Sequence, residues 1–437
     1  MTASIDDLLS LYNLNRTIIS TGSKEVVKFL GKIFPEGNIE SYQTGAHIST
    51  WDIPAQWDLV SGELKNLSTG RVILTDADSS LFIAPYSNSI NKTFSKSDLL
   101  KINLSNEILR DDFMYQHRLA YDINRRLKDV GISIPLNILD QMSNDDLYQL
   151  EIIIKSEPSQ LEIFNYTLNG ESDQTVFLLS HYCHTGQIND GLAGVVTCGK
   201  VMDKLKKKFS STKYSYSFLS FPETIGSSIF VAEHNSVLSK GLFSIFSEMP
   251  GAVSDFRITN SRRGDTYIDR VSEYILNSEN KIYKRVNFRE GWGNDEMVFD
   301  SPTVGIPSIS VDRFPFMFYH TSGDNPHNFS MSNLEETADI IFKTLEILER
   351  DYIPVPKYIS PPYLSKFNLY QDWTASKDLY MYTVKLLDNI ISGLSVFDIA
   401  NIEKIPLDFA YNFFDKLWEN GLIERKLIST DYTRRKI

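Results

Sequence analysis

Two short apolar runs separated by a helical pattern limit most strongly what this chain can fold into. Residues 175–180 and 216–221 are short and mostly apolar, as expected of strands buried in a parallel sheet. Between them, apolar residues recur at helical spacing from Leu192 to Leu205. This strand–helix–strand order predicts an open α/β sheet, and such sheets place their active sites at the carboxyl ends of the strands.

Polar side chains gather at the points where the predicted strands end. Imidazoles and carboxylates there suit zinc, which prefers nitrogen and oxygen ligands and keeps one position for water in a catalytic site. A separate carboxylate would take a proton from that water and pass it to a leaving amine. The candidates for such a metal or acid–base site are His181, His184, Asp190, Glu223, Glu248 and His320.

Each of these residues also has an ordinary structural interpretation. A single histidine at a strand end is more often a core residue than a ligand. Asp190 could cap the helix that follows it, and Glu223 could stabilise the first turn of the next helix. Convergence favours a functional site, because all of these residues stand where a strand stops and none fits an amphipathic pattern.

The composition bounds the class of protein. With 437 residues, 42% hydrophobic and 23% charged, we expect a soluble globular chain of two or three domains. The net charge of −12 argues against nucleic acid as a partner. No apolar run approaches the ~20 residues of a membrane span. The first residues do not resemble a signal peptide, and two cysteines favour a reduced, cytoplasmic setting. The sequence leaves open whether the chain forms a homo-oligomer.

The patterns along the chain predict an α/β domain that is interrupted by an insertion. The α/β domain is expected over residues 1–38 and 155–355, and the insertion over residues 39–154. The insertion is predicted to be β-rich, with strands near 47–51, 71–75 and 81–84 and helices near 115–127 and 144–153. Asn169-Gly170 predicts a hairpin turn into the strand at Thr175.

Residues 365–437 are predicted to form a winged-helix unit, after a linker marked by Pro354, Pro356, Pro361 and Pro362. Helices are expected at 379–387, 396–401 and 407–420, and residues 422–424 could start the wing. The longest helix would repel phosphate, because acidic residues outnumber basic ones along it. Those residues are Asp408, Asp415, Glu419 and Lys416. We therefore favour an interaction or packing unit over DNA binding.

The order of the candidate residues resembles the zinc exopeptidases of the aminopeptidase and glutamate-carboxypeptidase type. Their pattern is a histidine after a strand, an aspartate opening a helix, a Glu–Glu pair, an acidic residue and a final histidine. More closely, the chain resembles a bacterial aminopeptidase-like family, often encoded near polysaccharide-biosynthesis genes, with an inserted β domain and a C-terminal winged helix. The stretches that carry this resemblance are residues 183–185, 189–194, 222–227, 261–265, 294–296 and 319–325.

The resemblance implies a zinc-exopeptidase-like mixed sheet with flanking helices. It also implies a zinc site held by His184, Asp190 and His320, with Glu223 as the general base. The matching stretch favours His184 as the first ligand, whereas the spacing from the strand favours His181, so both stay open.

Other positions refine this expectation. Glu248 falls where the wider superfamily has its acidic ligand, and Asp295 would act beside the catalytic residues or the substrate. Thr224 stands where the superfamily has its second glutamate, which favours one zinc ion over two.

We therefore expect a zinc-dependent, aminopeptidase-like hydrolase acting on a peptide or on an amide of a small molecule. Arg262 and Arg263 could anchor a carboxylate or phosphate of the substrate, and Tyr319 could line its pocket. Cys183 is better understood as a buried thiol than as a nucleophile. The alternatives are a catalytically inactive binding or scaffold protein, which Thr224 favours, and a winged-helix DNA-binding regulator.

Overall fold

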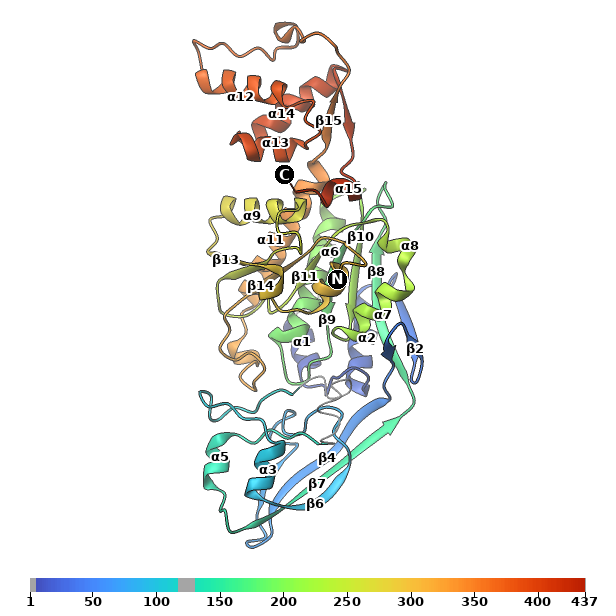
Figure 1. The fold of residues 1–437 in the computed structure, drawn as a ribbon, viewed down its shortest axis with the longest axis vertical. Coiled ribbons are helices and arrows are strands. Elements are labelled where there is room, and N and C mark those ends of the chain that lie inside the picture. The colour runs from blue at the N-terminus through green and yellow to red at the C-terminus, as the bar shows by residue number, and fades with distance from the viewer. Residues whose placement is uncertain (1–4, 117–129, 437) are drawn as a thin grey trace.

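The centre of the molecule is a mixed sheet of eight strands in the computed structural model, which describes residues 5–116 and 130–436 (Figure 1). The four strands in its middle are parallel to one another, and all of their residues are buried. The mixed α/β sheet predicted from the sequence is therefore confirmed. In spatial order the strands are β1 (Asn38–Gln43), β8 (Gln160–Leu168), β10 (Ser215–Phe221), β9 (Thr175–His181), β11 (Gly241–Ser247), β14 (Ser308–Arg313), β12 (Phe256–Thr259) and β13 (Tyr283–Val286).

Helices cover both faces of this sheet because its central strands are apolar on both sides. In β9, Val176 and Leu178 belong to one apolar core, whereas Phe177 and Leu179 belong to the other. One layer contains α1 (Ile5–Tyr12), α2 (Thr21–Ile33), α6 (Gly194–Lys208), α9 (Tyr267–Ser278) and α11 (Met331–Arg350). The other contains α7 (Ile225–Glu233), α8 (Asn235–Leu238) and α10 (Asp295–Phe299).

The turn at Asn169-Gly170 does not connect two paired strands, so the predicted hairpin is wrong. β10 lies between β8 and β9, antiparallel to the first and parallel to the second. Close packing explains the glycine instead, because a Cβ at Gly170 would lie 2.2 Å from the carbonyl oxygen of Tyr214.

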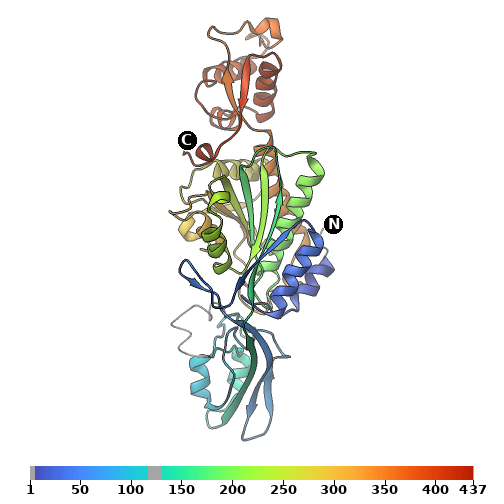
Figure 2. The ribbon, with the colours of Figure 1, turned by 90° about the vertical axis from the view of Figure 1, so that its right-hand side faces the viewer.

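A separate four-stranded antiparallel sheet lies at one end of the molecule (Figure 1, Figure 2). We call residues 53–159 the inserted module; α3 (Lys96–Ile102) and α5 (Leu136–Gln141) share its apolar core. Its strands, in spatial order, are β5 (Val72–Thr75), β4 (Gln56–Asn66), β7 (Leu147–Glu157) and β6 (Ile90–Ser95). Ahead of it, β2 (His47–Ile48) pairs with β3 (Trp51–Asp52), while β1 pairs with β8 in the large sheet.

The helix predicted at residues 144–153 is wrong, because these residues belong largely to β7. Tyr148, Leu150 and Ile152 are buried while Leu147 and Ile153 are exposed, which is the period of a strand. Residues 81–84 form no strand but a single bridge at Ile83. Most of the helix predicted at 115–127 lies outside the described residues.

A C-terminal unit with its own core lies at the opposite end (Figure 2). Its helices are α12 (Lys377–Asp388), α13 (Val396–Glu403) and α14 (Leu407–Glu419). β16 (Ile423–Lys426) pairs with β15 (Ile353–Pro356), so two prolines predicted in a linker lie in a strand. Each strand of a two-stranded ribbon is an edge strand, where proline is tolerated.

The end of the chain returns to the large sheet. In α15 (Thr430–Thr433), Thr433 Oγ1 donates to the carbonyl oxygen of Leu242 at 2.7 Å. None of the helices in the described part of the chain combines the length and the apolar composition that a bilayer crossing requires.

Candidate metal centre

The carboxyl ends of adjacent parallel strands bring the predicted metal-site residues together. His181 ends β9, Glu223 follows β10 and Glu248 follows β11. Asp190 lies in a kinked turn (Asn189–Ala193) ahead of α6, and His320 lies in the loop after β14. The convergence expected from the order of apolar runs is thus found in the fold.

Asp190 lies at the centre of this cluster. Its Oδ1 is 3.3 Å from His181 Nε2 and 3.9 Å from His184 Nε2. Its Oδ2 is 2.9 Å from His320 Nε2. The next residue, Gly191, has a φ of 103°, and a Cβ there would lie 3.3 Å from the His181 ring. Glycine therefore allows the chain to turn this close to an imidazole.

Two glutamates border the cluster. Glu248 Oε2 lies 2.6 Å from His181 Nε2, and Glu223 Oε2 lies 3.7 Å from His184 Nε2. The side chains of these four residues are almost fully buried, whereas that of His320 is 14% exposed. His320 is therefore the member of the cluster that solvent reaches most easily.

Burial and charge act in opposite directions on the central carboxylates. Burial alone would raise the pKa of Asp190, but His184, His181 and His320 hold the pKa of this carboxyl well below its usual range. Burial raises the pKa of Glu248 to about 8, against the opposing effect of His181. The neighbouring imidazoles thus favour the ionised form of Asp190, and a bound metal cation would favour it in the same way.

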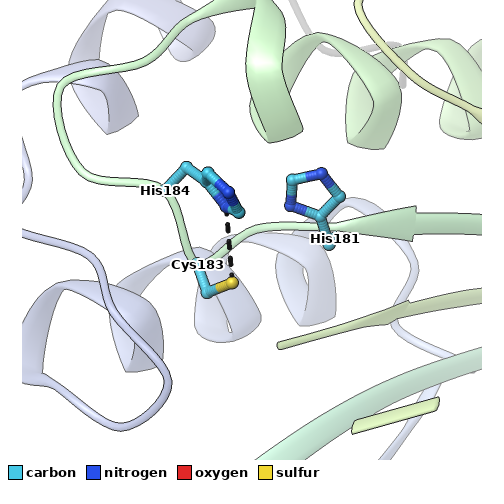
Figure 3. A group of neighbouring side chains, drawn as sticks. All are labelled: His181, Cys183 and His184. Carbon is cyan, nitrogen blue, oxygen red and sulfur yellow. Dashed lines mark hydrogen bonds between the residues drawn. The ribbon is translucent and has the colours of Figure 1, made fainter. Parts of the chain in front are cut away.

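The donor atoms are close enough together to hold a cation. Three groups have their ligand atoms within 4.8 Å of one another: His184, Asp190 and His320; His181, Asp190 and Glu248; and His181, Cys183 and His184. Figure 3 shows the last group, with the two imidazoles near each other and the Cys183 sulfur toward His184. Buried imidazole and carboxylate donors fit zinc. Both histidines left open by the sequence lie within reach of Asp190.

Two buried side chains that the sequence analysis did not single out hold the loops that carry these ligands. Arg16, from the segment before α2, donates from Nη2 to the carbonyl oxygen of Gln187 at 2.7 Å. Asp324 accepts the backbone N–H groups of Asn189 and Asp190, each at 3.0 Å. Gln187 is 171 residues away from Arg16 in sequence, so no local pattern could have revealed this contact.

The backbone around Glu223 is held on both sides. The Glu223 N–H donates to Cys183 Sγ at 3.2 Å, and the same sulfur lies 3.5 Å from His184 Nδ1. The Thr224 N–H donates to Asp295 Oδ1 at 2.8 Å. Thr224 has a φ of 64°, an unfavourable conformation for a β-branched residue. Burial raises the pKa of Asp295 to about 6.

Two aromatic rings lie beside the cluster. The ring of Tyr319 lies 3.9 Å from that of His320 and nearly parallel to it, and the ring of Trp292 lies 4.8 Å from that of Tyr319. Burial, with the nearby charges of Asp190 and Glu248, raises the pKa of Tyr319 above its ordinary value. The predicted pocket residue Tyr319 is therefore beside the cluster.

Arg262 and Arg263 are not brought to the cluster, which corrects the expectation that they anchor a substrate there. β12 runs antiparallel to β14, so the turn that follows β12 lies at the other edge of the sheet. The Arg262 side chain donates to the carbonyl oxygen of Asp300, and that of Arg263 donates to the carbonyl oxygen of Arg434. Both guanidinium groups therefore have structural partners.

Known proteins share this fold. The chain is 27% identical over 369 residues, 83% of its length and 81% of the relative's, to a Clostridium acetobutylicum protein provisionally named a polysaccharide biosynthesis protein with an aminopeptidase-like domain. A crystal structure from the same organism, provisionally named a peptidase, matches with a TM-score of 0.80 and 23% identity over 96% of this chain and 94% of that one. A zinc aminopeptidase from Bacillus subtilis matches with a TM-score of 0.56 and 14% identity, over 77% and 93%.

These matches confirm the resemblance to aminopeptidase-like proteins. A family described as "Domain of unknown function (DUF4910)" matches residues 6–351, from the first helix to the end of α11. The match includes the large sheet, the inserted module and the residues of the candidate metal centre. Because it covers well over half of the 437 residues, the chain belongs to the DUF4910 family.

Proposed function

We propose that this protein is a zinc-dependent, aminopeptidase-like hydrolase that cleaves a peptide bond or another amide. The observation that carries the proposal is the buried cluster in which His181, His184 and His320 all meet Asp190. Buried charged groups of this density are costly unless they pair with one another or bind a metal. A zinc aminopeptidase has a similar fold.

His184, Asp190 and His320 are the proposed ligands of a single zinc ion. His181 and Glu248 lie beside them and contact each other at 2.6 Å. One ion is favoured over two, because Thr224 offers no carboxylate at the position where the wider superfamily has its second glutamate. When bound, zinc supplies a Lewis acid that activates water and polarises an amide carbonyl.

Glu223 is the proposed general base. Its buried carboxylate lies 3.7 Å from Nε2 of His184, a proposed ligand, so it stands beside the proposed metal centre without belonging to any of the three groups of close donor atoms. It accepts a proton from the attacking water and delivers it to the departing amine nitrogen. The hydroxyl of the water joins the acyl carbon as the C–N bond breaks, and the products are a carboxylic acid and an amine.

Asp295 is proposed to act through the backbone of Thr224, next to Glu223. Its Oδ1 accepts both the Thr224 N–H at 2.8 Å and the Ser227 hydroxyl at 2.6 Å. These bonds hold Thr224 at positive φ and so fix the direction in which Glu223 leaves the strand.

Tyr319 is proposed to contact the substrate, because it stacks on the most exposed member of the cluster. The substrate class is a peptide or a small molecule that bears an amide. Since the name of the C. acetobutylicum relative refers to polysaccharide biosynthesis, amide-bearing sugars belong in the panel of compounds to test.

A second candidate function is a catalytically inactive binding or scaffold protein that uses the inserted module and the C-terminal unit. Thr224 favours it, because the wider superfamily supplies a carboxylate at that position. The DNA-binding alternative is disfavoured by α14, where Asp408 pairs with Arg350 at 2.7 Å and Asp415 pairs with Arg425.

The experiment that tests the proposal is the metal content of the purified chain, compared with His320→Ala and His327→Ala. His327 is the matched control, because it is exposed and seven residues away. We expect about one zinc per chain in the wild type and in His327→Ala, and little in His320→Ala, because removing a ligand abolishes tight binding.

Hydrolysis of a panel of peptides, amino-acid amides and amide-bearing sugars then separates the two candidate functions. A wild type that takes up no zinc at micromolar concentration would refute the hydrolase. Zinc uptake without any turnover across the panel would favour the binding protein.

A further inference from the structure

A segment of the inserted module runs along the loop that carries His320. The Tyr115 N–H donates to the carbonyl oxygen of His320 at 2.8 Å, and the Ser322 N–H donates to the carbonyl oxygen of Phe113 at 2.8 Å. Met114 and Thr321 form an antiparallel bridge between these two bonds. The backbone of residues 113–115 is therefore paired with the backbone of the loop.

Side chains reinforce this pairing. The Thr321 hydroxyl donates to Asp112 Oδ2 at 2.9 Å, and the Phe113 N–H donates to Ser322 Oγ at 3.1 Å. Thr321 is fully buried. The inserted module thus fixes the residues that directly follow His320.

The loop needs such support because His320 has a φ of 57°. A non-glycine residue rarely adopts this left-handed conformation, and it persists only where the surrounding structure holds it. The bond from the Tyr115 N–H to His320 is one contact that holds it.

The side chain of Tyr115 reaches the two imidazoles themselves. Its ring centroid lies 4.7 Å from that of His184, at an angle of 41°, and 5.3 Å from that of His320, edge to face at 74°. Tyr115 is 5% exposed, so its ring is buried against these two imidazoles. One ring therefore restricts the rotation of two histidines that come from different loops of the α/β core.

We propose that the inserted module completes the metal centre, with Tyr115 as a positioning residue that sets the planes of His184 and His320. The inference rests on the proposed function, because it assumes that these imidazoles bind a metal. Contacts that orient metal ligands matter for affinity, and removing one typically weakens metal binding by about 10–100-fold.

The test compares zinc and cobalt binding by the full chain as wild type, Tyr115→Ala, Tyr115→Phe and Phe113→Ala. Phe113 is the matched control, because it lies two residues away and packs against the module's own core. We expect Tyr115→Ala to bind zinc about 10–100-fold more weakly. Phe113→Ala should bind it as the wild type does, and Tyr115→Phe, which keeps the ring, should bind it more tightly than Tyr115→Ala does.

The visible spectrum of the cobalt-loaded protein gives a readout that a loss of general stability would not change. Its bands should shift further in Tyr115→Ala than in Tyr115→Phe, which keeps the ring. If Tyr115→Ala fails to fold, Tyr115→Leu decides the question, because it keeps apolar volume and lacks the ring.

Wild-type affinity and an unchanged spectrum in Tyr115→Ala or Tyr115→Leu would overturn this inference and leave the proposed function intact. A wild type that binds neither metal would instead refute the proposed function. The melting temperature of each metal-free variant shows that the comparison concerns folded protein.

Discussion

Glu223 is the residue on which the chemistry of the proposed reaction depends. Replacing it with glutamine removes the proton acceptor and keeps the shape of the side chain. We expect Glu223→Gln to lose about 10²–10⁴-fold in turnover, the usual contribution of general acid–base catalysis, with its zinc content unchanged. Initial rates and metal analysis of the same preparation check this. Full activity in Glu223→Gln would assign the base to another group.

Asp324 is a residue whose role is to hold another residue in place. Asp324→Ala leaves the backbone N–H groups of Asn189 and Asp190 buried without their acceptor. We expect the free energy of unfolding to fall by about 1–3 kcal/mol and zinc binding to weaken with it, as measured by urea denaturation and zinc titration.

Asp339→Ala is the control for this change. The Asp339 carboxylate is 51% exposed and pairs with Lys204 at the surface. An exposed pair of this kind contributes about 0–1 kcal/mol. Equal losses in the two variants would contradict the role given to Asp324.

At the residue scale, the sequence predicted which side chains come together at the strand ends better than it predicted the residues that hold them there. His181, His184, Asp190, Glu223, Glu248 and His320 could be found because each follows a recognisable strand or opens a helix. Arg16 and Tyr115 could not be found in this way, because each reaches the cluster from a segment far away in the sequence.

At the scale of elements, one glycine determines how closely the turn between β8 and β9 can approach β10. A Cβ at Gly170 would lie 2.2 Å from the Tyr214 carbonyl oxygen. We expect Gly170→Ala to destabilise the fold by about 1–3 kcal/mol, as other overpacked sites do. The measurement is thermal or urea unfolding.

Gly31→Ala in α2 is the opposite case. The nearest atom to a Cβ at Gly31 is 3.9 Å away, and the residue lies within a helix. Alanine there should stabilise the protein by about 0.5–1 kcal/mol. A stabilising Gly170→Ala would show that the turn relaxes freely.

The elements also explain which sequence predictions failed. Residues 152–154 are apolar in succession, a pattern that suits either a helix or a strand, and pairing with β4 and β6 decides for the strand. Arg262 was misplaced for a different reason. A sequence does not reveal that β12 runs against its neighbour, and this direction sends the following turn away from the cluster.

At the scale of the whole molecule, a buried ion pair joins the C-terminal unit to the α/β core. Arg270 in α9 donates from Nε and Nη2 to the two carboxylate oxygens of Asp398 in α13, at 2.7 and 3.0 Å. Asp398→Ala leaves a buried guanidinium without this partner. We expect the free energy of unfolding to fall by about 3–5 kcal/mol. The measurement is urea denaturation monitored by the fluorescence of Trp418.

Asp265→Ala is the matched control, since Asp265 approaches the same arginine at 3.7 Å and is 46% exposed. The free energy of unfolding of Asp265→Ala should fall by no more than about 1 kcal/mol. If both variants lose the same amount, the pair with Asp398 does not hold the unit to the core.

Among the described residues, the inserted module is attached to the core at more than one place. The first attachment is the antiparallel pair of β4 and β7, which extends from the core with eleven residues in each strand. Residues 112–115 then come back to meet residues 320–322. A module attached at one place can rotate about that attachment, whereas a further attachment prevents this rotation. The sequence and even the length of the module's far tip can therefore change without altering the distance between these attachments.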